Sequence, residues 1–400
     1  MKPEDFKSTS AGHCRKTLEG YYAYLPNSLP PKIDLNWELV NLLSEADRAM
    51  SELSGAGQLL PNPHLLIRPY LKREAILSSR IEDTHADMQE LAVLEEDSAI
   101  DPRQGALEVA NYVRAMDIGL ARMKEIPIST RLIRELHAVL LKNVRGGEST
   151  KAPGEFRRSQ NWIGPQGCSL AEASFVPPQW EDIGPALGEW EKYVNAPSRE
   201  PPLIKAALMH YQFETIHPFL DGNGRIGRLL ITLYLCSSGC LSLPLLYLSG
   251  FFDDTRGEYY RLLMNVSRHG AWREWVEYFL RGVRQQARFA IDDTNWMLAQ
   301  HRHWESVAKD GKRIPGEAAR MLERIFANPV VSISKYAERN AISYLTAQKA
   351  VEFWQKKGLL REFSGQKRNR LYAAFDLLNI MSRPRPKPVD EQQELPFGGG

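Results

Sequence analysis

The stretch Ile216–Leu230, IHPFLDGNGRIGRLL, combines residue types that a purely structural segment seldom needs together. It places one imidazole, one carboxylate, three glycines and two arginines within twelve residues. Pro218 disfavours helix at His217, whereas Arg225 to Cys236 has the apolar periodicity of a new helix. The stretch therefore predicts a helix that ends at His217, a short loop, and a second helix.

The start of the second helix has the composition of an anion-binding site. Gly222, Asn223 and Gly224 fall where unpaired backbone N–H groups and the helix dipole favour an anion, and glycine lets a phosphate approach closely. Arg225 and Arg228 are three residues apart and share one helix face. We therefore expect both guanidinium groups to reach the same polyphosphate with forked hydrogen bonds.

Two further side chains of the loop suggest a reaction. Asp221 suits a Mg²⁺ ion that bridges phosphate oxygens. The near-neutral pKa of a histidine fits His217 to take a proton from an incoming hydroxyl. The glycines also satisfy the G-x-G-x-x-G pattern of dinucleotide-binding folds, but a helix precedes them where that fold needs a strand. The layout predicts transfer of a phosphate-containing group.

The segment HPFLDGNGRIGR, residues 217–228, resembles the signature of the Fic family at every fixed position: HPF, any residue, Asp or Glu, GNGR, two variable residues and Arg. The resemblance extends from about Leu60 to Phe289. It implies that His217 is the general base, that Asp221 holds Mg²⁺ and that ATP is the cosubstrate. The residues that it assigns to ATP are Gly222, Asn223, Gly224, Arg225, Ile226, Gly227 and Arg228, with Tyr259 and Tyr260 as candidates for the adenine pocket.

The resemblance implies a protein adenylyltransferase, which transfers AMP from ATP to a Ser, Thr or Tyr hydroxyl of a protein, including this chain itself. Relatives that transfer phosphate usually carry lysine where this chain has Gly224, which favours AMP transfer. Two alternatives stay open: a Fic variant that removes AMP or transfers phosphate, and a DNA-binding regulator whose Fic core senses nucleotide.

Residues 156–178, FRRSQNWIGPQGCSLAEASFVPP, resemble the Fic flap, the element that pairs with an extended segment of the target. The runs Gln160–Gly164 and Ala173–Val176 are β-prone and predict a hairpin. A target protein would dock on residues 160–178 by strand addition, which needs no fixed target sequence.

An upstream segment, LSSRIEDT, resembles the Fic inhibitory motif, which reads Ser or Thr, three residues, Glu, then Gly or Asn. Ser78 and Glu82 are four residues apart and lie on one helix face. Asp83 departs from the motif's last position, where the residue shapes the helix end. The resemblance implies that Glu82 pairs with Arg228 and denies that arginine to the γ-phosphate.

The composition is that of a soluble globular protein, with 43% hydrophobic and 25% charged residues and a formal charge of +2. No global field attracts nucleic acid or membrane. Four cysteines without metal-like or disulfide-like spacing indicate a reducing, cytoplasmic location. We expect no membrane-spanning segment, and the sequence leaves homodimer formation open.

The expected fold class is mainly α: a Fic helical core with a β-hairpin flap, plus a small C-terminal winged-helix-like domain. Continuous helical periodicity is read over Leu65–Glu95 and over Thr255–Ala290. Basic residues give residues 329–375 a potential DNA contact: Lys356, Lys357, Arg361, Lys367, Arg368 and Arg370. The expected divisions are an N-terminal helical region with the inhibitory helix (1–106), the Fic catalytic core (107–290), a linker helix (291–328), the winged-helix-like domain (329–380) and a disordered tail (381–400).

Overall fold

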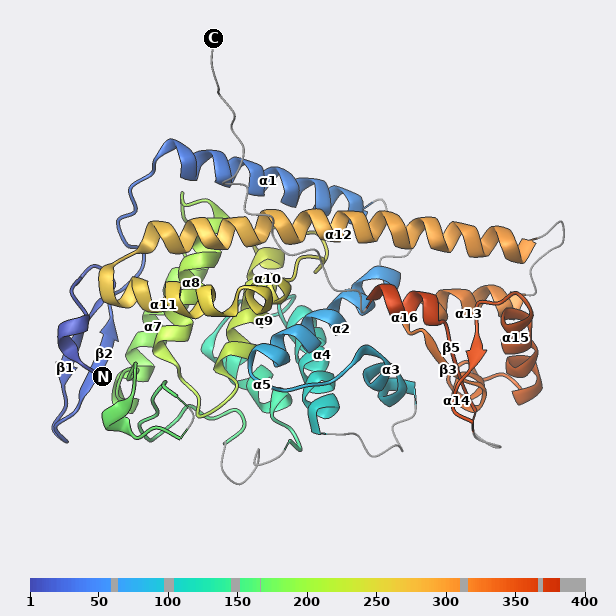
Figure 1. Ribbon diagram of the computed structural model, residues 1–400, viewed down its shortest axis with the longest axis horizontal. Helices are drawn as coiled ribbons and strands as arrows, with labels where there is room; N and C mark the ends of the chain where they lie inside the picture. Colours follow the sequence, from blue (N-terminus) through green and yellow to red (C-terminus); the bar gives the residue numbers. More distant parts are fainter. Residues whose placement is uncertain are drawn as a thin grey trace, which may run out of the picture.

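A computed structural model describes residues 1–58, 64–96, 104–144, 152–165, 167–309, 316–365 and 370–381. The mainly α fold expected from the sequence is confirmed (Figure 1). Residues 382–400 of the expected tail, together with Lys367 and Arg368, lie outside the described residues.

The helices carry nearly all of the core. They are α1 (Trp37–Gln58), α2 (His64–Ile81), α3 (Met88–Glu96), α4 (Gln104–Arg122), α5 (Thr130–Leu140), α7 (Trp180–Asn195), α8 (Pro202–Ile216), α9 (Asn223–Ser237), α10 (Ser249–Asp254), α11 (Arg256–His269), α12 (Trp272–Lys309), α13 (Gly316–Ala327), α14 (Ile333–Arg339), α15 (Tyr344–Lys356) and α16 (Phe375–Met381).

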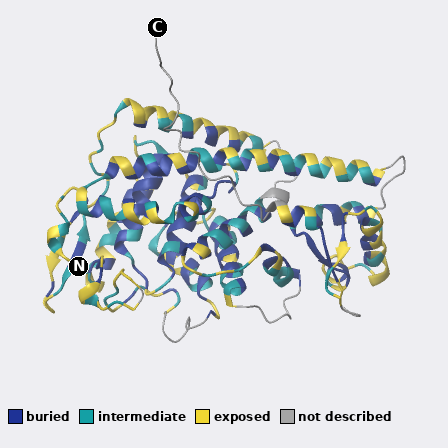
Figure 2. Cartoon of the chain, in the orientation of Figure 1, coloured by how far each residue is buried: buried dark blue, intermediate teal, exposed yellow. Residues whose placement is uncertain are grey.

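Helix α8 lies at the centre of the molecule. Almost all of its residues from Leu203 to Ile216 are buried, including the polar His210 and Gln212. A helix that is apolar all round must be covered on every side, and α8 packs against α7, α9 and α12. Figure 2 shows the buried residues gathered in these central helices. The first residue after α8 is His217, so a helix that is buried on nearly every side positions the imidazole.

Helices α1 and α12 lie side by side across one face of the core (Figure 1). The periodicity read over Thr255–Ala290 belongs to two helices, because Gly270 takes a left-handed φ of 68° and ends α11. Helix α12 then runs without a break from Trp272 to Lys309. The expected division at 290/291 therefore falls inside a helix.

The helical periodicity read over Leu65–Glu95 belongs to two helices, because the chain breaks between α2 and α3. Asp83, with a φ of 59°, takes a left-handed conformation two residues after the end of α2. Glycine and asparagine adopt this conformation most readily, which is why the related motif favours them there. Glu82 therefore lies in the turn just after α2 and not in a helix interior.

The regular β-hairpin is at the N-terminus, where the sequence indicated no strands. Strands β1 (Gly12–Lys16) and β2 (Tyr22–Pro26) pair antiparallel. The flap at residues 160–178 forms one isolated bridge between Ile163 and Phe175 instead of two strands. Tyr24 N donates to Val176 O at 2.9 Å, so β2 supports the C-terminal arm of the flap. Phe6 and Tyr24 also pack against Phe175.

The C-terminal unit combines helices α13 to α16 with a small antiparallel sheet in the order β3-β5-β4. Its strands are β3 (Val330–Ser332), β4 (Arg361–Glu362) and β5 (Leu371–Ala373). Helices α14 and α15 are joined by a short turn, and the Ser343 hydroxyl caps α15 by accepting from Thr346 N. The unit packs against α2 and α3, the helices that flank Glu82.

A buried carboxylate joins this unit to the core. Glu96, at the end of α3, is 1% exposed and pairs with Arg324 at 2.7 Å and with Arg339. Its second oxygen accepts a hydrogen bond from Ser332 N at 2.9 Å. Because the carboxylate is almost fully buried, its partners must compensate for the lost hydration. Among the described residues, no helix is long and apolar enough to span a membrane.

We expect Glu96→Ala to lower the free energy of unfolding by about 3 kcal/mol. The substitution leaves two partly buried guanidinium groups and a buried N–H without their carboxylate partner. Urea unfolding followed by circular dichroism measures the change. Glu338→Ala is the control: Glu338 is 71% exposed and pairs with Lys335, so its loss should cost no more than about 0.5 kcal/mol. Equal midpoints for the two variants would contradict this role of Glu96.

Candidate active site

The loop of residues 217–222, the His217 loop, connects α8 to α9. His217 itself has left-handed backbone angles, φ 50° and ψ 58°, which are costly for a residue with a Cβ. Asn223 holds the loop in shape: its side-chain oxygen accepts from Phe219 N, and its amide donates to Phe219 O, both at 2.8 Å. The expected role of Asn223 as a nucleotide ligand is therefore restricted to its backbone, because its side chain bonds the loop.

Arg157 is the main side-chain support of this loop. Its guanidinium donates to His217 O at 3.0 Å, to Ser159 O at 3.1 Å and to Pro178 O at 2.5 Å. Its backbone N–H donates to Pro218 O at 2.9 Å. One buried side chain thus joins the strained His217 loop to both arms of the flap. The sequence analysis did not single out Arg157.

The His217 imidazole is arranged as a base. Its Nδ1 lies 3.2 Å from Glu214 O, and because a carbonyl only accepts, Nδ1 carries the proton and Nε2 is left unprotonated. Burial lowers the pKa of His217 from 6.5 to about 4, although the contact with Glu214 O opposes the shift. The ring is therefore neutral at physiological pH, as proton abstraction requires.

Two other histidines have structural partners. His137 contacts Asp221 O at 3.0 Å through Nε2, accepts from Gly154 N at 2.9 Å through Nδ1, and stacks on Phe219. His210 lies 2.8 Å from the Tyr259 hydroxyl. Burial lowers the pKa of both imidazoles, to about 4 for His137 and about 3 for His210. Both rings are neutral parts of the scaffold.

The Arg228 guanidinium is 1% exposed, and its partners come from α2 and the turn that follows it, whereas its Nη1 has no partner among the described residues. Its Nε donates to Ser78 Oγ and its Nη2 to Ser78 O, each at 2.9 Å. Nη2 also pairs with Glu82 Oε1 at 2.8 Å. The structure thus brings together Ser78, Glu82 and Arg228, which are about 150 positions apart in the sequence. We call the Glu82–Arg228 contact the inhibitory pair, after the motif that Ser78 and Glu82 resemble.

Two ion pairs fix the end of α2 beside this pair. Asp83, the departure from the related motif, forms a two-pronged pair with Arg256 at 2.8 and 3.1 Å. Arg80 pairs with Asp253. Both partners lie at the α10–α11 corner, and Arg256 also lies over the Tyr260 ring. Asp83 therefore ties the inhibitory residue to the helix that carries Tyr259 and Tyr260.

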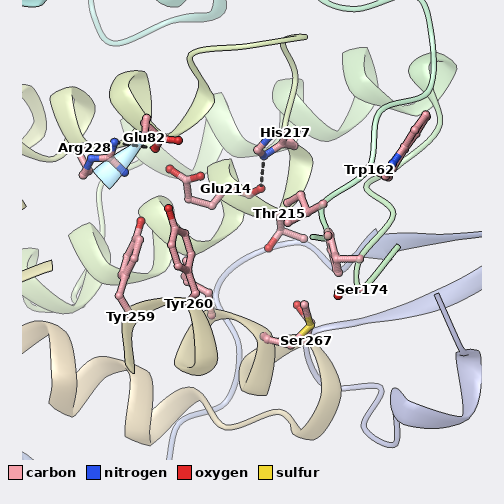
Figure 3. Close-up of a pocket in the computed structure, with 16 residues that line it drawn as sticks. Glu82, Trp162, Ser174, Glu214, Thr215, His217, Arg228, Tyr259, Tyr260 and Ser267 are labelled. Carbon is pink, nitrogen blue, oxygen red and sulfur yellow. Dashed lines mark hydrogen bonds and ion pairs between the residues drawn. The ribbon is translucent and has the colours of Figure 1, made fainter. Parts of the chain in front are cut away.

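A cavity of about 600 Å³ opens beside these groups. Figure 3 shows His217, Glu214, Arg228 and Glu82 along one side of it, with Tyr260 of α11 facing them. Its lining residues are Glu82, Trp162, Ile163, Gly164, Ser174, Phe175, Glu214, Thr215, His217, Gly224, Arg228, Tyr259, Tyr260, Leu263, Met264 and Ser267. The flap, the His217 loop and the inhibitory pair thus share one space.

The expected convergence of two arginines is not seen. Arg225 is 3% exposed and pairs with Glu108 at 2.7 Å and with Asp221 at 3.3 Å, and only Arg228 lines the cavity. Tyr259 is buried with its hydroxyl against His210, whereas Tyr260 is 43% exposed. Glu214 was missed, although a carboxylate on an otherwise apolar helix, one turn before His217, was a visible signal.

The structure has a helical core, with the His217 loop and a glycine-rich helix start beneath a flap. This arrangement defines the Fic fold. Residues 127–235 match the Fic/DOC family, and residues 40–121 match the Fic/DOC family N-terminal region. Glu82 lies in the second of these matched regions, and His217 and Arg228 lie in the first.

The curated relatives include Protein adenylyltransferase Fic of Drosophila yakuba, which is 30% identical over 199 residues, 48% of this chain and 35% of that protein. The protein of the same name from Drosophila melanogaster is 29% identical over 199 residues, 48% of this chain and 36% of its own. The match thus spans about a third of the length of these relatives.

Solved structures share the fold. A Fic family protein from Desulfovibrio desulfuricans G20 superposes with a TM-score of 0.55 at 19% identity, covering 86% of this chain and 98% of its own. A Fic domain containing signaling protein from Bacteroides thetaiotaomicron VPI-5482 has a TM-score of 0.50 at 20% identity, covering 63% and 97%. At these identities the likeness concerns the fold alone.

We expect Arg157→Ala to loosen the His217 loop, because three carbonyl oxygens lose a charged donor and the left-handed His217 loses its support. The stability loss should be about 3 kcal/mol, and amide exchange should rise in the peptide that covers residues 213–221. Arg158→Ala is the matched control, since Arg158 is the exposed neighbour. Unchanged exchange in Arg157→Ala would contradict the role given to this side chain.

The lowered pKa of His217 leads to a second testable expectation. The imidazole should stay neutral from pH 8 down to pH 5 and gain its proton only near pH 4, because burial disfavours the cation. An NMR titration of the His217 Cε1–H, assigned by comparison with His217→Ala, measures this. Protonation near the ordinary value of about 6.5 would show that the ring is solvated.

Proposed function

We propose that this chain transfers AMP from ATP to a hydroxyl group of a protein. The acceptor oxygen would attack the α-phosphorus, pyrophosphate would leave, and Nε2 of His217 would take the hydroxyl proton. The observation that carries the proposal is the shared cavity, in which a neutral His217 and the Arg228 cation face the same space at the start of α9. The two Drosophila relatives, named protein adenylyltransferases, support it.

The backbone at the start of α9 would hold the phosphates. Gly222 takes a φ of 78° and precedes the first turn, which leaves unpaired N–H groups at the end of the helix. Gly224 lines the cavity. A Cβ at Gly224 would lie 2.2 Å from Glu82 Oε1 and 2.8 Å from Arg228 Nη1, so a side chain there would displace a member of the inhibitory pair.

We assign one ligand of a phosphate-bridged Mg²⁺ to Asp221, whose Oδ1 accepts from Gly222 N and pairs with Arg225 in the structure. Among the described residues no cluster of three His, Cys, Asp or Glu side chains forms a complete metal cage. Mg²⁺ in nucleotide sites needs fewer protein ligands, because substrate phosphates and waters complete its shell. Asp221, 35% exposed and directly before Gly222, would hold the ion, which would neutralise phosphate charge.

Glu82 would restrain the reaction through Arg228. In the structure Nε and Nη2 of Arg228 donate to Ser78 and Glu82, and Nη1 has no partner among the described residues. A γ-phosphate that binds Nη2 would compete with the Glu82 carboxylate. A change of about 1.4 kcal/mol in that competition alters the productive fraction roughly tenfold. Small movements of α2 would therefore have large effects on rate.

The target would be a protein segment laid against the flap. Trp162 and Ile163 are 41% and 40% exposed beside the cavity mouth, and Ile163 already bridges Phe175 through backbone hydrogen bonds. An extended peptide would extend this pairing. The short turn between α14 and α15 and the three-stranded sheet support our assignment of the C-terminal unit as winged-helix-like. Through its contacts with α2 it would influence the inhibitory pair.

We expect Glu82→Gly to raise AMP transfer about tenfold or more, because Arg228 becomes free for the γ-phosphate. The assay follows label from ATP into protein, with the label in the α-phosphate in one reaction and in the γ-phosphate in another. Incorporation of the α-label alone indicates AMP transfer. Incorporation of the γ-label would instead identify a phosphate-transferring Fic variant.

Two controls accompany this assay. Glu52→Gly makes the same substitution at an exposed position of α1 and should leave transfer unchanged. His217→Ala in the Glu82→Gly background should abolish incorporation. Transfer by Glu82→Gly at or below the wild-type rate would exclude restraint by this residue.

A further inference from the structure

Glu214 is a carboxyl group in the cavity that the mechanism above does not use. It lies in the last turn of α8, and Figure 3 shows its side chain between Arg228 and His217. Within the described part of the chain, Oε1 of Glu214 is buried and has no hydrogen-bond partner. Buried polar atoms are almost always paired, so an unpaired one on a residue that lines a cavity indicates a missing partner atom.

The fold makes room for this carboxyl at a specific place. A Cβ at Gly227 would lie 2.2 Å from Glu214 Oε1, so the carboxyl packs directly against the bare Cα of Gly227 on α9. Gly227 precedes Arg228, the residue that would meet the phosphates. The glycine assigned to nucleotide binding from the sequence thus admits Glu214 to the phosphate end of the cavity.

The neighbouring groups determine the charge of this carboxyl. Burial raises the pKa of Glu214 to about 8, the Arg228 cation opposes the shift, and the Glu82 carboxylate adds to it. Tyr259 and Tyr260 of α11 also interact electrostatically with Glu214. At neutral pH Glu214 is mainly the uncharged acid, which has an O–H to donate.

The neighbouring histidines do not pair with the Glu214 carboxyl. His210 lies one turn back on α8 and contacts the Tyr259 hydroxyl through Nε2, whereas its Nδ1 is buried without a partner among the described residues. The ring of His217 contacts the backbone oxygen of Glu214, not its carboxyl. The carboxyl therefore retains hydrogen-bonding capacity that a bound ligand could use.

We propose that Glu214 is a nucleotide-binding residue whose carboxylic acid donates a hydrogen bond to a phosphate oxygen of the bound nucleotide, next to Arg228. This inference rests on the proposed function in taking the cavity as the nucleotide site. An uncharged acid contributes a hydrogen bond without adding negative charge beside the phosphates. A second ionised carboxylate, next to Glu82, would repel them.

The proposal determines how nucleotide affinity depends on pH. The bound form needs the proton on Glu214, so affinity is retained below pH 8 and lost as pH rises through that value. With a pKa of about 8 for Glu214, the competent fraction near pH 9 is about a tenth, which weakens binding about tenfold. Glutamine donates a similar hydrogen bond and does not titrate, so Glu214→Gln should remove this dependence.

The test is calorimetric titration of the full chain with the magnesium complex of a non-hydrolysable ATP analogue, near pH 7 and near pH 9. We expect Glu214→Gln to bind within about twofold of wild type near pH 7, and Glu214→Ala about tenfold more weakly. Wild type should weaken near pH 9, whereas Glu214→Gln should not. Adenosine, which has no phosphate, should bind wild type and Glu214→Ala alike.

Three results would overturn the proposal: wild-type affinity for Glu214→Ala, equal weakening in Glu214→Gln and Glu214→Ala, or the same pH dependence in wild type and Glu214→Gln. Thermal unfolding of each variant checks that the fold is retained, and Gly227→Ala, which displaces the carboxyl, should reproduce the loss.

Absence of AMP transfer with normal nucleotide binding would defeat the proposed function alone. Absence of nucleotide binding by wild type would defeat both.

Discussion

The account depends on the burial of one cation, the Arg228 guanidinium. A guanidinium that is 1% exposed must be paired, and here its partners are Ser78 and Glu82 at the end of α2. The same requirement links the N-terminal helices to the catalytic core, because any movement of α2 leaves Arg228 without compensation unless another anion replaces Glu82. A nucleotide γ-phosphate is such an anion. The Glu82 carboxylate and the γ-phosphate would thereby compete for the same cation.

Hydrogen bonds to backbone carbonyls position His217 and the flap. His217 adopts a left-handed conformation that its own side chain disfavours, and it is held by Arg157, which also contacts both arms of the flap. The backbone carbonyl of Glu214, in the most buried helix α8, orients the His217 imidazole. Desolvation keeps the imidazole neutral. Base, flap and phosphate site are thus positioned by one connected set of contacts.

The sequence predicted the helical core, the His217 loop and the pairing of Glu82 with Arg228. Each of these features follows from the spacing of nearby residues or from a contiguous motif. It did not predict Arg157 or Glu214, whose importance comes from neighbours on other elements that no spacing reveals. It placed Arg225 in the phosphate site, whereas Glu108 of α4 engages that cation. Apolar periodicity continues past Asp83, and the left-handed backbone there, stabilised by Arg256, separates α2 from α3.

The most direct test of the central claim is a crystal structure of the full chain with Mg²⁺ and a non-hydrolysable ATP analogue. The account expects the phosphates on the backbone N–H groups at the start of α9, with the α-phosphorus facing Nε2 of His217 and Arg228 beside the terminal phosphates. A nucleotide bound elsewhere, or with its phosphates directed away from the His217 loop, would contradict it.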